Sequence, residues 1–296
     1  KKMKFEDTIS DEYKGEFLSC CKNDLDQVLK HFNPGKSPYK LPKKLGTYIA
    51  KLEKYDLITP QRKESFETKF KDDLNPSNID HLKLNRICTD YQNYDIEDCF
   101  LAILAWGQLH MGKNTLFLAW KSLNNLDFKK FLEDIRSGKE KDRKKIYSRF
   151  ITERLEGRLK GINVAYFTKL IYFLMIEEQG RGYILDQFTA RSANILLKKN
   201  IINIDKNINK ENGEIRLLVD GKRNDAEAYE KYCSFIEDNA KYLDNYFRKE
   251  LSKTDKEIEP KHSEIFIFYD NKDPSGWRKK SEKIFKQNIC SLVEVE

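Results

Sequence analysis

The sequence predicts a mainly α-helical protein with a minor β component. Apolar residues recur at helical spacing over long segments of the 296-residue chain, notably 11–32 and 225–251. Segment 95–110 opens with acidic residues, which suit a helix N-terminus, and then becomes strongly apolar. The clearest strand-like segment is 264–269, with the sequence EIFIFY. Because this segment stands alone, any sheet should be minor and helices should form the core.

Further helices are expected between the turn signals along the chain. Asn124 and Asn125 are candidate caps for the helix expected at 126–135. The polar residues 60–85 are expected to be a boundary or a long loop, and 198–214 a loop with one short extended piece. The remaining segments with amphipathic or apolar helical character are 41–57, 115–120, 126–135, 146–158 and 164–176.

The chain length allows one large domain or two intimate ones. We expect residues 95–200 to form the functional core. Residues 1–94 would then be an N-terminal helical region that packs with the C-terminal part, and residues 201–296 a C-terminal helical region.

Composition limits the binding partners and the cellular compartment that we expect for the protein. The net charge of +7 permits a polyanionic partner but does not require one. The six cysteines include no C-x-x-C pair and no closely spaced group of four, so no metal site and no cofactor are expected. We expect a reduced, cytoplasmic monomer without a membrane segment, because no apolar run is long enough to cross a bilayer.

Two isolated charges stand out in the apolar centre of the chain. Lys169 is the only charged residue in 164–176, and Asp186 is the only one in the segment Tyr-Ile-Leu-Asp-Gln-Phe, 183–188. A buried ammonium group is costly unless a partner or a reaction uses it. The alternatives are a lysine that extends to the helix edge and an aspartate that caps the next helix.

A turn with the sequence Leu-Lys-Gly-Ile-Asn, 159–163, lies between two predicted helices. The N–H groups of such a turn and the positive end of the following helix can bind a DNA phosphate. An ordinary turn between two helices is the alternative interpretation.

These segments together resemble the helix–hairpin–helix DNA glycosylase superfamily, which includes endonuclease III and the 8-oxoguanine DNA glycosylases. The residues that match the order of its motif are Leu159, Gly161, Ile162, Asp186 and Arg191. The sequences AYFTKLIYFL and YILDQFTARSANIL, with Trp106-Gly107, are similar to bacterial proteins of the 8-oxoguanine glycosylase fold. The resemblance covers roughly residues 95–200. It implies an all-α (mainly) fold in which two helical subdomains flank a cleft.

Two positions depart from the superfamily pattern. Asn163 stands where the second hairpin glycine is usual, although asparagine tolerates a left-handed backbone. Lys169 lies one helical turn beyond Ala165, where the catalytic lysine is usual. The second departure leaves open an enzyme without lyase activity.

The resemblance implies a glycosylase that excises a damaged or modified, 8-oxoguanine-like base from double-stranded DNA. Asp186 would stabilise positive charge on the sugar, and Lys169, desolvated by Phe167, Leu170 and Phe173, would be a partly neutral nucleophile that forms a Schiff base. The alternatives are excision of a modified base of phage DNA in anti-phage defence, a non-catalytic DNA-binding module, and a helical protein-interaction domain.

Binding residues follow from the same interpretation. Residues expected to contact DNA are Lys160, Gly161, Ile162, Asn163, Arg191, Lys198 and Lys199. Residues expected to line the base pocket or to wedge the duplex are Trp106, Gln108, Tyr183, Gln187 and Phe188, each with a structural role as the alternative.

Overall fold

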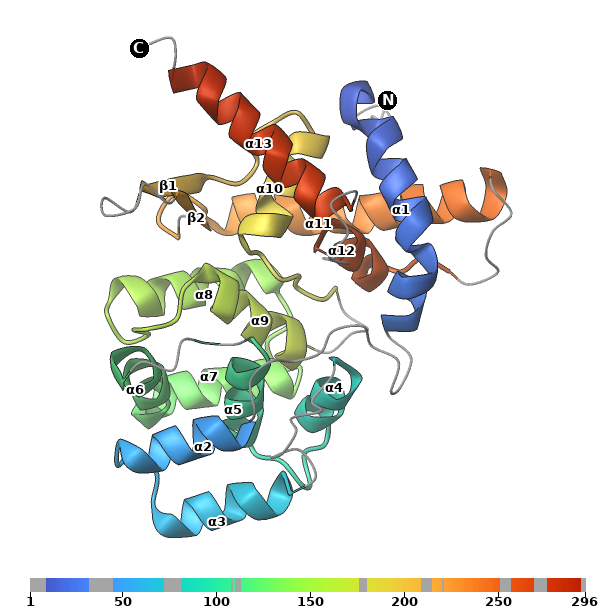
Figure 1. Cartoon of the computed structure of the whole chain (residues 1–296). Helices are drawn as coiled ribbons and strands as arrows, with labels where there is room; N and C mark the ends of the chain where they lie inside the picture. The colour runs from blue at the N-terminus through green and yellow to red at the C-terminus, as the bar shows by residue number, and fades with distance from the viewer. Residues whose placement is uncertain are drawn as a thin grey trace. The chain divides into compact units, whose positions relative to one another are not determined.

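In the computed structural model of the chain, the described residues are 9–31, 45–71, 81–107, 109, 113–175, 180–208, 215–219, 221–250, 257–268 and 276–293. Within these ranges there are thirteen α-helices and one two-stranded sheet, as predicted (Figure 1). None of the described helices is both long enough and apolar enough to cross a membrane.

The chain divides into two compact units. Unit 1 consists of Lys1–Leu29 and Tyr183–Glu296, and unit 2 of Lys30–Gly182. Helix α1 (Asp11–His31) therefore lies mainly in the unit that contains the C-terminal part of the chain, whereas residues 45–94 belong with the helices up to α9 (Val164–Leu174). These boundaries differ from those of the three regions expected from sequence, which stay a prediction.

The α-helices of unit 2 are α2 (Leu45–Lys54), α3 (Pro60–Lys69), α4 (His81–Thr89), α5 (Ile96–Trp106), α6 (Lys113–Lys121), α7 (Leu126–Arg136), α8 (Arg143–Leu155) and α9 (Val164–Leu174). Among them, α5 packs against α2, α4, α7 and α9. Nine of the eleven residues of α5 are buried. Asn125 caps α7 as predicted, because its side chain accepts from the N–H groups of Asp127 and Phe128.

The prediction that residues 60–85 form a boundary or long loop is wrong for the described part, which contains α3 and α4. Thr59 caps α3, and Pro60 occupies its first turn, where a missing N–H costs nothing. The sequence is polar because α3 buries only Phe66. Its attachment to the unit depends on ion pairs as well as on apolar packing.

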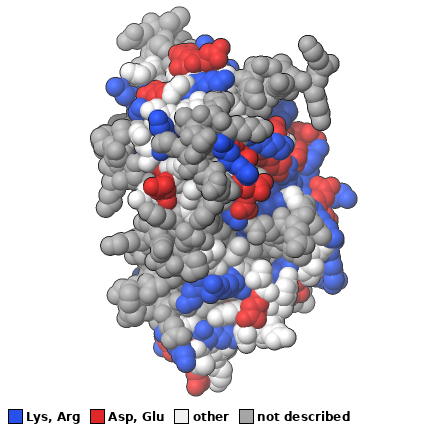
Figure 2. Space-filling model, turned by 90° about the vertical axis from the view of Figure 1, so that its right-hand side faces the viewer, with Lys and Arg blue, Asp and Glu red and all other residues white. Residues whose placement is uncertain are grey.

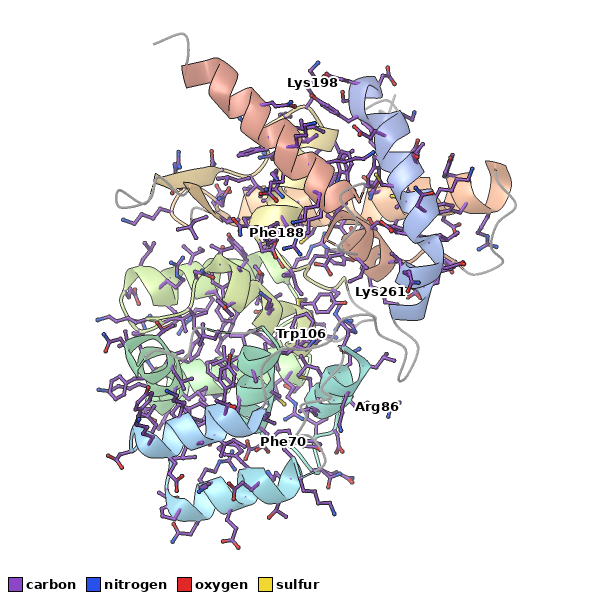
Figure 3. The ribbon with its side chains drawn as sticks, in the orientation of Figure 1. Phe70, Arg86, Trp106, Phe188, Lys198 and Lys261 are labelled. Atoms are coloured by element: carbon purple, nitrogen blue, oxygen red, sulfur yellow. The ribbon has the colours of Figure 1, made fainter. Side chains whose placement is uncertain are left out.

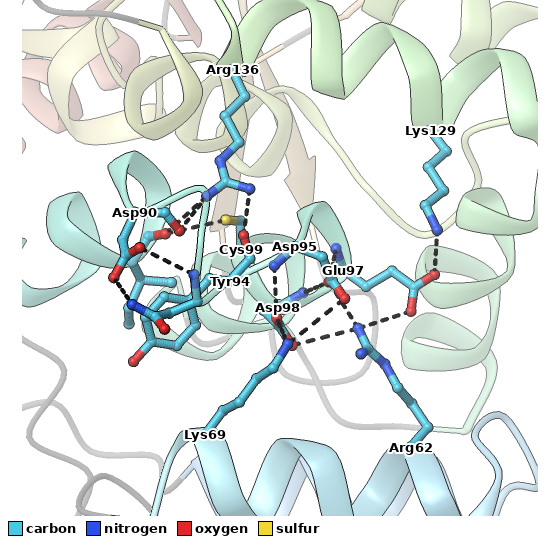
Figure 4. A network of polar contacts seen from close by, with 12 residues as sticks. Arg62, Lys69, Asp90, Tyr94, Asp95, Glu97, Asp98, Cys99, Lys129 and Arg136 are labelled. Atoms are coloured by element: carbon cyan, nitrogen blue, oxygen red, sulfur yellow. Dashed lines mark hydrogen bonds and ion pairs between the residues drawn. The ribbon is translucent and has the colours of Figure 1, made fainter.

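A network of charges joins α3 to the start of α5 (Figure 4). The carboxylate of Asp98 is completely buried, and it accepts from Lys69 Nζ at 2.5 Å. Arg62 pairs with Asp95, the cap of α5, at 2.8 Å. Asp95 and Asp98 also form a reciprocal capping box. The network therefore anchors the polar helix on the most apolar one.

Unit 1 contains the remaining elements. They are α1 (Asp11–His31), α10 (Gln187–Leu196), β1 (Ile204–Ile208), β2 (Ile215–Val219), α11 (Ala226–Asn245), a π-helical turn (Tyr246–Glu250), α12 (Pro260–Phe268) and α13 (Trp277–Val293). The strands pair antiparallel, with Ile204 opposite Val219. Strand β1 is the short extended piece expected in 198–214, whereas β2 was not expected.

Two side-chain contacts attach α1 to α13 within unit 1. The ring of Phe17 lies edge-on to Trp277, with 5.1 Å between ring centroids. Lys280 pairs with Glu16 at 2.9 Å. The helices predicted at 11–32 and 225–251 are confirmed over Asp11–His31 and Ala226–Glu250, the last turn of the second being π-helical.

The prediction of a strand at 264–269 is wrong for its described part, which lies in helix α12. Glu259 sets the start of this helix, because its carbonyl accepts from the N–H groups of His262 and Ser263. Its own N–H donates to His262 Nδ1 at 3.0 Å. Residues 262–267 are all buried. A helix buried on every side shows no polar face, so its sequence is hard to tell from that of a buried strand.

Candidate functional site

The predicted hairpin is formed by the end of α8, the residues 156–163 and the start of α9. Gly161 has a φ of +77°, in the left-handed region, and Leu159 and Ile162 are buried on either side of it. Asn163 is not left-handed, in contrast to what its place in the motif suggests. Its φ is −93°, and its side chain accepts from Tyr166 N–H as the cap of α9. Asparagine therefore serves here for its side-chain oxygen.

Close packing explains the glycine of this hairpin. A Cβ atom at Gly161 would lie 2.6 Å from the carbonyl oxygen of Thr115, on α6. Only a residue without a side chain permits that approach. Lys160, the neighbouring predicted DNA contact, is exposed.

Lys169 lies on α9 and is half-buried. Its Nζ donates to the carbonyl of Ala165 at 3.2 Å and lies 4.8 Å from the centroid of the Tyr166 ring. The predicted apolar neighbours are buried, but they do not enclose the amine on all sides. The ring of Tyr166 attracts the ammonium group, so the site combines burial with a cation–π contact.

Trp106, labelled in Figure 3, is the last residue of α5, and it lies in the same part of unit 2 as Lys169. Its ring packs edge-on against Phe173, with 4.9 Å between centroids, and against His81 at 6.4 Å. His81 Nε2 is hydrogen-bonded to the hydroxyl of Tyr172 at 2.7 Å. Trp106 is half-buried, so part of its ring can face a ligand. Gln108 lies outside the described residues.

Asp186 is the cap of α10, which confirms the capping interpretation. Its Oδ1 accepts from Phe188 N–H at 2.8 Å and from Thr189 N–H at 3.0 Å. The hydroxyl of Thr189 accepts in return from Asp186 N–H at 3.1 Å. Because both cap bonds end on Oδ1, the cap orients the carboxylate without using Oδ2.

Other predicted residues of unit 1 lie close to this cap in the chain. Tyr183 is buried, and its carbonyl accepts from the hydroxyl of Tyr229 at 2.8 Å. Gln187 and Phe188 are half-buried in the first turn of α10. Figure 3 labels Phe188. The guanidinium of Arg278 lies 3.6 Å from the centroid of the Phe188 ring. A planar aromatic group and a cation therefore stack at the start of α10.

Arg191 lies inside unit 1, with 2% of its surface exposed. It donates to the carbonyl of Arg278 at 3.3 Å, and burial lowers its pKa to about 10. Its position supports the start of α13 and does not present the guanidinium at the surface.

The two predicted lysines after α10 are exposed. Lys198 has a φ of +48° and pairs with Glu12 at 3.1 Å. Basic and acidic side chains are interspersed on the face shown in Figure 2. Lys169 belongs to unit 2 and Asp186 to unit 1. A meeting of these two side chains stays a prediction.

The sequence interpretation missed Glu264, a buried carboxylate on α12 that accepts from the N–H of Ile184, two residues before Asp186. The signal was present, because Glu264 opens the apolar run EIFIFY much as Lys169 interrupts its own. Among the described residues, no group of three or more histidine, cysteine or acidic side chains could hold a metal ion.

The comparisons with known proteins identify a family. The family model described as "Putative 8-oxoguanine DNA glycosylase OGG-like protein" matches residues 63–268. The searches of curated proteins and of solved structures find no match. The match covers well over half of the chain, and it includes the hairpin, Lys169 and Asp186. The chain therefore belongs to the family of 8-oxoguanine DNA glycosylase OGG-like proteins, a family of DNA glycosylases for DNA repair, and it has their mainly α-helical fold.

Proposed function

We propose that the protein excises a damaged or modified base from double-stranded DNA by cleaving the N-glycosidic bond. The observation that carries this proposal is the family match over 63–268, which spans all the predicted catalytic elements. The base must leave the stack before its sugar can be reached. The half-buried rings of Trp106 and Phe188 are suited to stack on an extruded base or to wedge the duplex.

Asp186 is proposed to stabilise the positive charge that develops on the sugar as the base leaves. A preorganised charge is most effective where its orientation is set before the reaction. The capping bonds to Phe188 and Thr189 set this orientation through Oδ1. Oδ2 is then the oxygen proposed to face the sugar.

Lys169 is proposed to be the nucleophile of a combined glycosylase and lyase reaction. Once the ammonium group has lost a proton, the neutral amine would form a bond to C1′ of the deoxyribose while the N-glycosidic bond breaks and the base leaves with the amine's proton. Opening of the sugar ring would then give a Schiff base. Support comes from the half-buried side chain and from its position beside Trp106-Gly107.

DNA contacts are proposed at the hairpin and after α10. The N–H groups of residues 161–163 and the N-terminus of α9 suit a phosphate. The exposed side chains of Lys160, Lys198 and Lys199 suit neighbouring phosphates. Each phosphate contact should add to the salt dependence of binding.

The test is base release from a panel of duplexes, each with one modified base, combined with borohydride trapping. We expect release of an 8-oxoguanine-like purine and a covalent complex that Lys169→Ala abolishes. Release that survives Lys169→Ala but not Asp186→Asn would indicate an enzyme without lyase chemistry. Release of a modified cytosine instead would indicate defence against phage DNA.

A non-catalytic DNA-binding module is the second candidate. The observation that favours it is the place of Lys169, one helical turn beyond the usual position of the lysine. Duplex binding without release of any base from the panel would support this module and would contradict the proposed reaction.

A further inference from the structure

The extended segment that leads into Asp186 is held by side chains from two helices of unit 1. The peptide groups of Ile184 are the centre of these contacts. Its N–H donates to Glu264 Oε1, on α12, at 2.5 Å. Its carbonyl accepts from the hydroxyl of Tyr232, on α11, at 2.7 Å. Side chains therefore supply this segment with the hydrogen-bond partners that a neighbouring strand would supply in a sheet.

The same carbonyl is connected to the cap of α10. The hydroxyl of Thr189 donates to Ile184 O at 3.0 Å and accepts from the N–H of Asp186 at 3.1 Å. Three side chains thus converge on one residue, and one of them also belongs to the capping box. A displacement of Ile184 would be transmitted to the carboxylate of Asp186 within two residues of chain.

The groups that hold Ile184 are shielded from water. Tyr232 is completely buried and Glu264 is 4% exposed. Burial, and then the charge of Glu264, raises the pKa of Tyr232 well above its ordinary value, so the hydroxyl stays protonated as a donor. Hydrogen bonds in such surroundings are geometrically well defined, because no water competes for the same groups.

We propose that Glu264 and Tyr232 are positioning residues for the glycosylase reaction, which fix the direction of the Asp186 carboxylate through the peptide groups of Ile184. This inference rests on the proposed function. A carboxylate is not needed merely to fill this part of the core, because a buried charge costs free energy that an apolar side chain would not. Its value here lies in a strong acceptor at one defined point.

The experiment compares single-turnover base excision by wild type, Glu264→Ala, Glu264→Gln and Tyr232→Phe. Glutamine keeps an oxygen acceptor for the Ile184 N–H, and phenylalanine removes only the hydroxyl. Ser263→Ala is the matched control, because Ser263 is the buried neighbour on α12 whose hydroxyl contacts Asn239 instead, at 2.9 Å. Amide hydrogen exchange over residues 183–189 and the melting temperature are measured on every variant.

We expect Glu264→Ala to lower the single-turnover rate on the order of 10- to 100-fold. Tyr232→Phe should lower it less, since Thr189 still donates to the same carbonyl. Glu264→Gln should recover most of the loss, and the enzyme concentration that gives half of the maximal single-turnover rate should stay within about threefold of wild type. Amide hydrogen exchange over residues 183–189 should be faster in Glu264→Ala than in wild type, at temperatures below the onset of thermal unfolding of the variant.

Three outcomes distinguish a failure of this inference from a failure of the proposed function. An active wild type whose Glu264→Ala and Ser263→Ala variants have equal rates and equal exchange over 183–189 would overturn the positioning role alone. Glu264→Gln as slow as Glu264→Ala would also overturn it, because the acceptor would then not be what matters. A wild type that releases no base would overturn the proposed function, and with it any catalytic role for Glu264, whatever the exchange data are.

Discussion

Gly107 and Lys169 are packed so closely that a side chain at position 107 would begin 3.0 Å from Cδ of the lysine. The same Cβ atom would lie 3.2 Å from Cε1 of Tyr166, the ring under the lysine amine. Gly107 has a φ of −70°, which any residue can adopt. The glycine is therefore favoured by close packing and not by backbone conformation, since a side chain there would displace the stem of Lys169 or the Tyr166 ring from the end of α5.

Gly107→Ala is expected to displace the amine of Lys169 and to slow formation of the trapped complex about tenfold, because a misplaced nucleophile loses its approach to the sugar. Single-turnover trapping with borohydride measures this rate. Gly15→Ala is the control, because a Cβ atom there would meet nothing within 4 Å. Equal trapping by the two variants would show that Gly107 does not position the lysine.

Gly161→Ala is expected to lower the free energy of unfolding by roughly 3 kcal/mol. The left-handed backbone and the contact with Thr115 O both oppose a side chain. Gly157→Ala is a matched control with a similar φ of +72°, since its Cβ would meet only the flexible end of Lys160. Urea unfolding should therefore show a smaller loss at position 157. If both variants lose the same unfolding free energy, backbone strain alone is the cause, and the contact with Thr115 O does not contribute.

Asp98→Ala is expected to lower the free energy of unfolding by about 3 kcal/mol, because it leaves Lys69 and Arg62 without the buried carboxylate between them. The exposed pair of Lys63 and Glu53, at 2.8 Å, provides the comparison. Lys63→Ala should cost less than about 1 kcal/mol. Chemical unfolding of both variants measures the contrast, and similar losses would argue against the buried network as the anchor of α3.

Glu153→Gln should make the free energy of unfolding depend less on pH in the acid range. Burial opposes ionisation of Glu153, but the hydrogen bond from Arg158 and the charge of Arg149 outweigh it, so its pKa is lowered in the folded state. A carboxyl group with a lowered folded pKa stabilises the protein above its unfolded value of about 4.3, and that contribution disappears as the pH falls through the folded pKa.

The difference in unfolding free energy between wild type and Glu153→Gln should therefore be largest at pH 7 and shrink below about pH 4. Urea unfolding at a series of pH values measures it. Glu64→Gln, at an exposed position of α3, is measured beside it for comparison. A pH-independent difference for Glu153→Gln would contradict the proposed ionic contribution.

Local signals in the sequence were sufficient for most of the helices and for some of their caps. A cap acts within three residues of chain, so Asn125 and Asp186 could be named as candidates without knowledge of the fold, whereas Asn163, expected to be left-handed, proved to be the cap of α9. Hydrophobic periodicity predicted the wrong element where the buried residues do not form one apolar face of a helix. Helix α3 buries one residue and looked like a loop, and α12 is buried over residues 262–267 and looked like a strand.

The candidate site likewise has some features that the sequence shows and others that only the fold shows. The apolar runs around Lys169 and Asp186 marked both residues as unusual, because an isolated charge in such a run is a property of the sequence alone. Their surroundings come from distant parts of the chain. Gly107 makes room for Lys169, and Glu264 holds the peptide before Asp186 from a position 80 residues beyond Ile184. Such contacts exist only once helices remote in sequence pack together, because van der Waals contact and hydrogen bonding act over a few ångströms and leave no periodic trace in the chain.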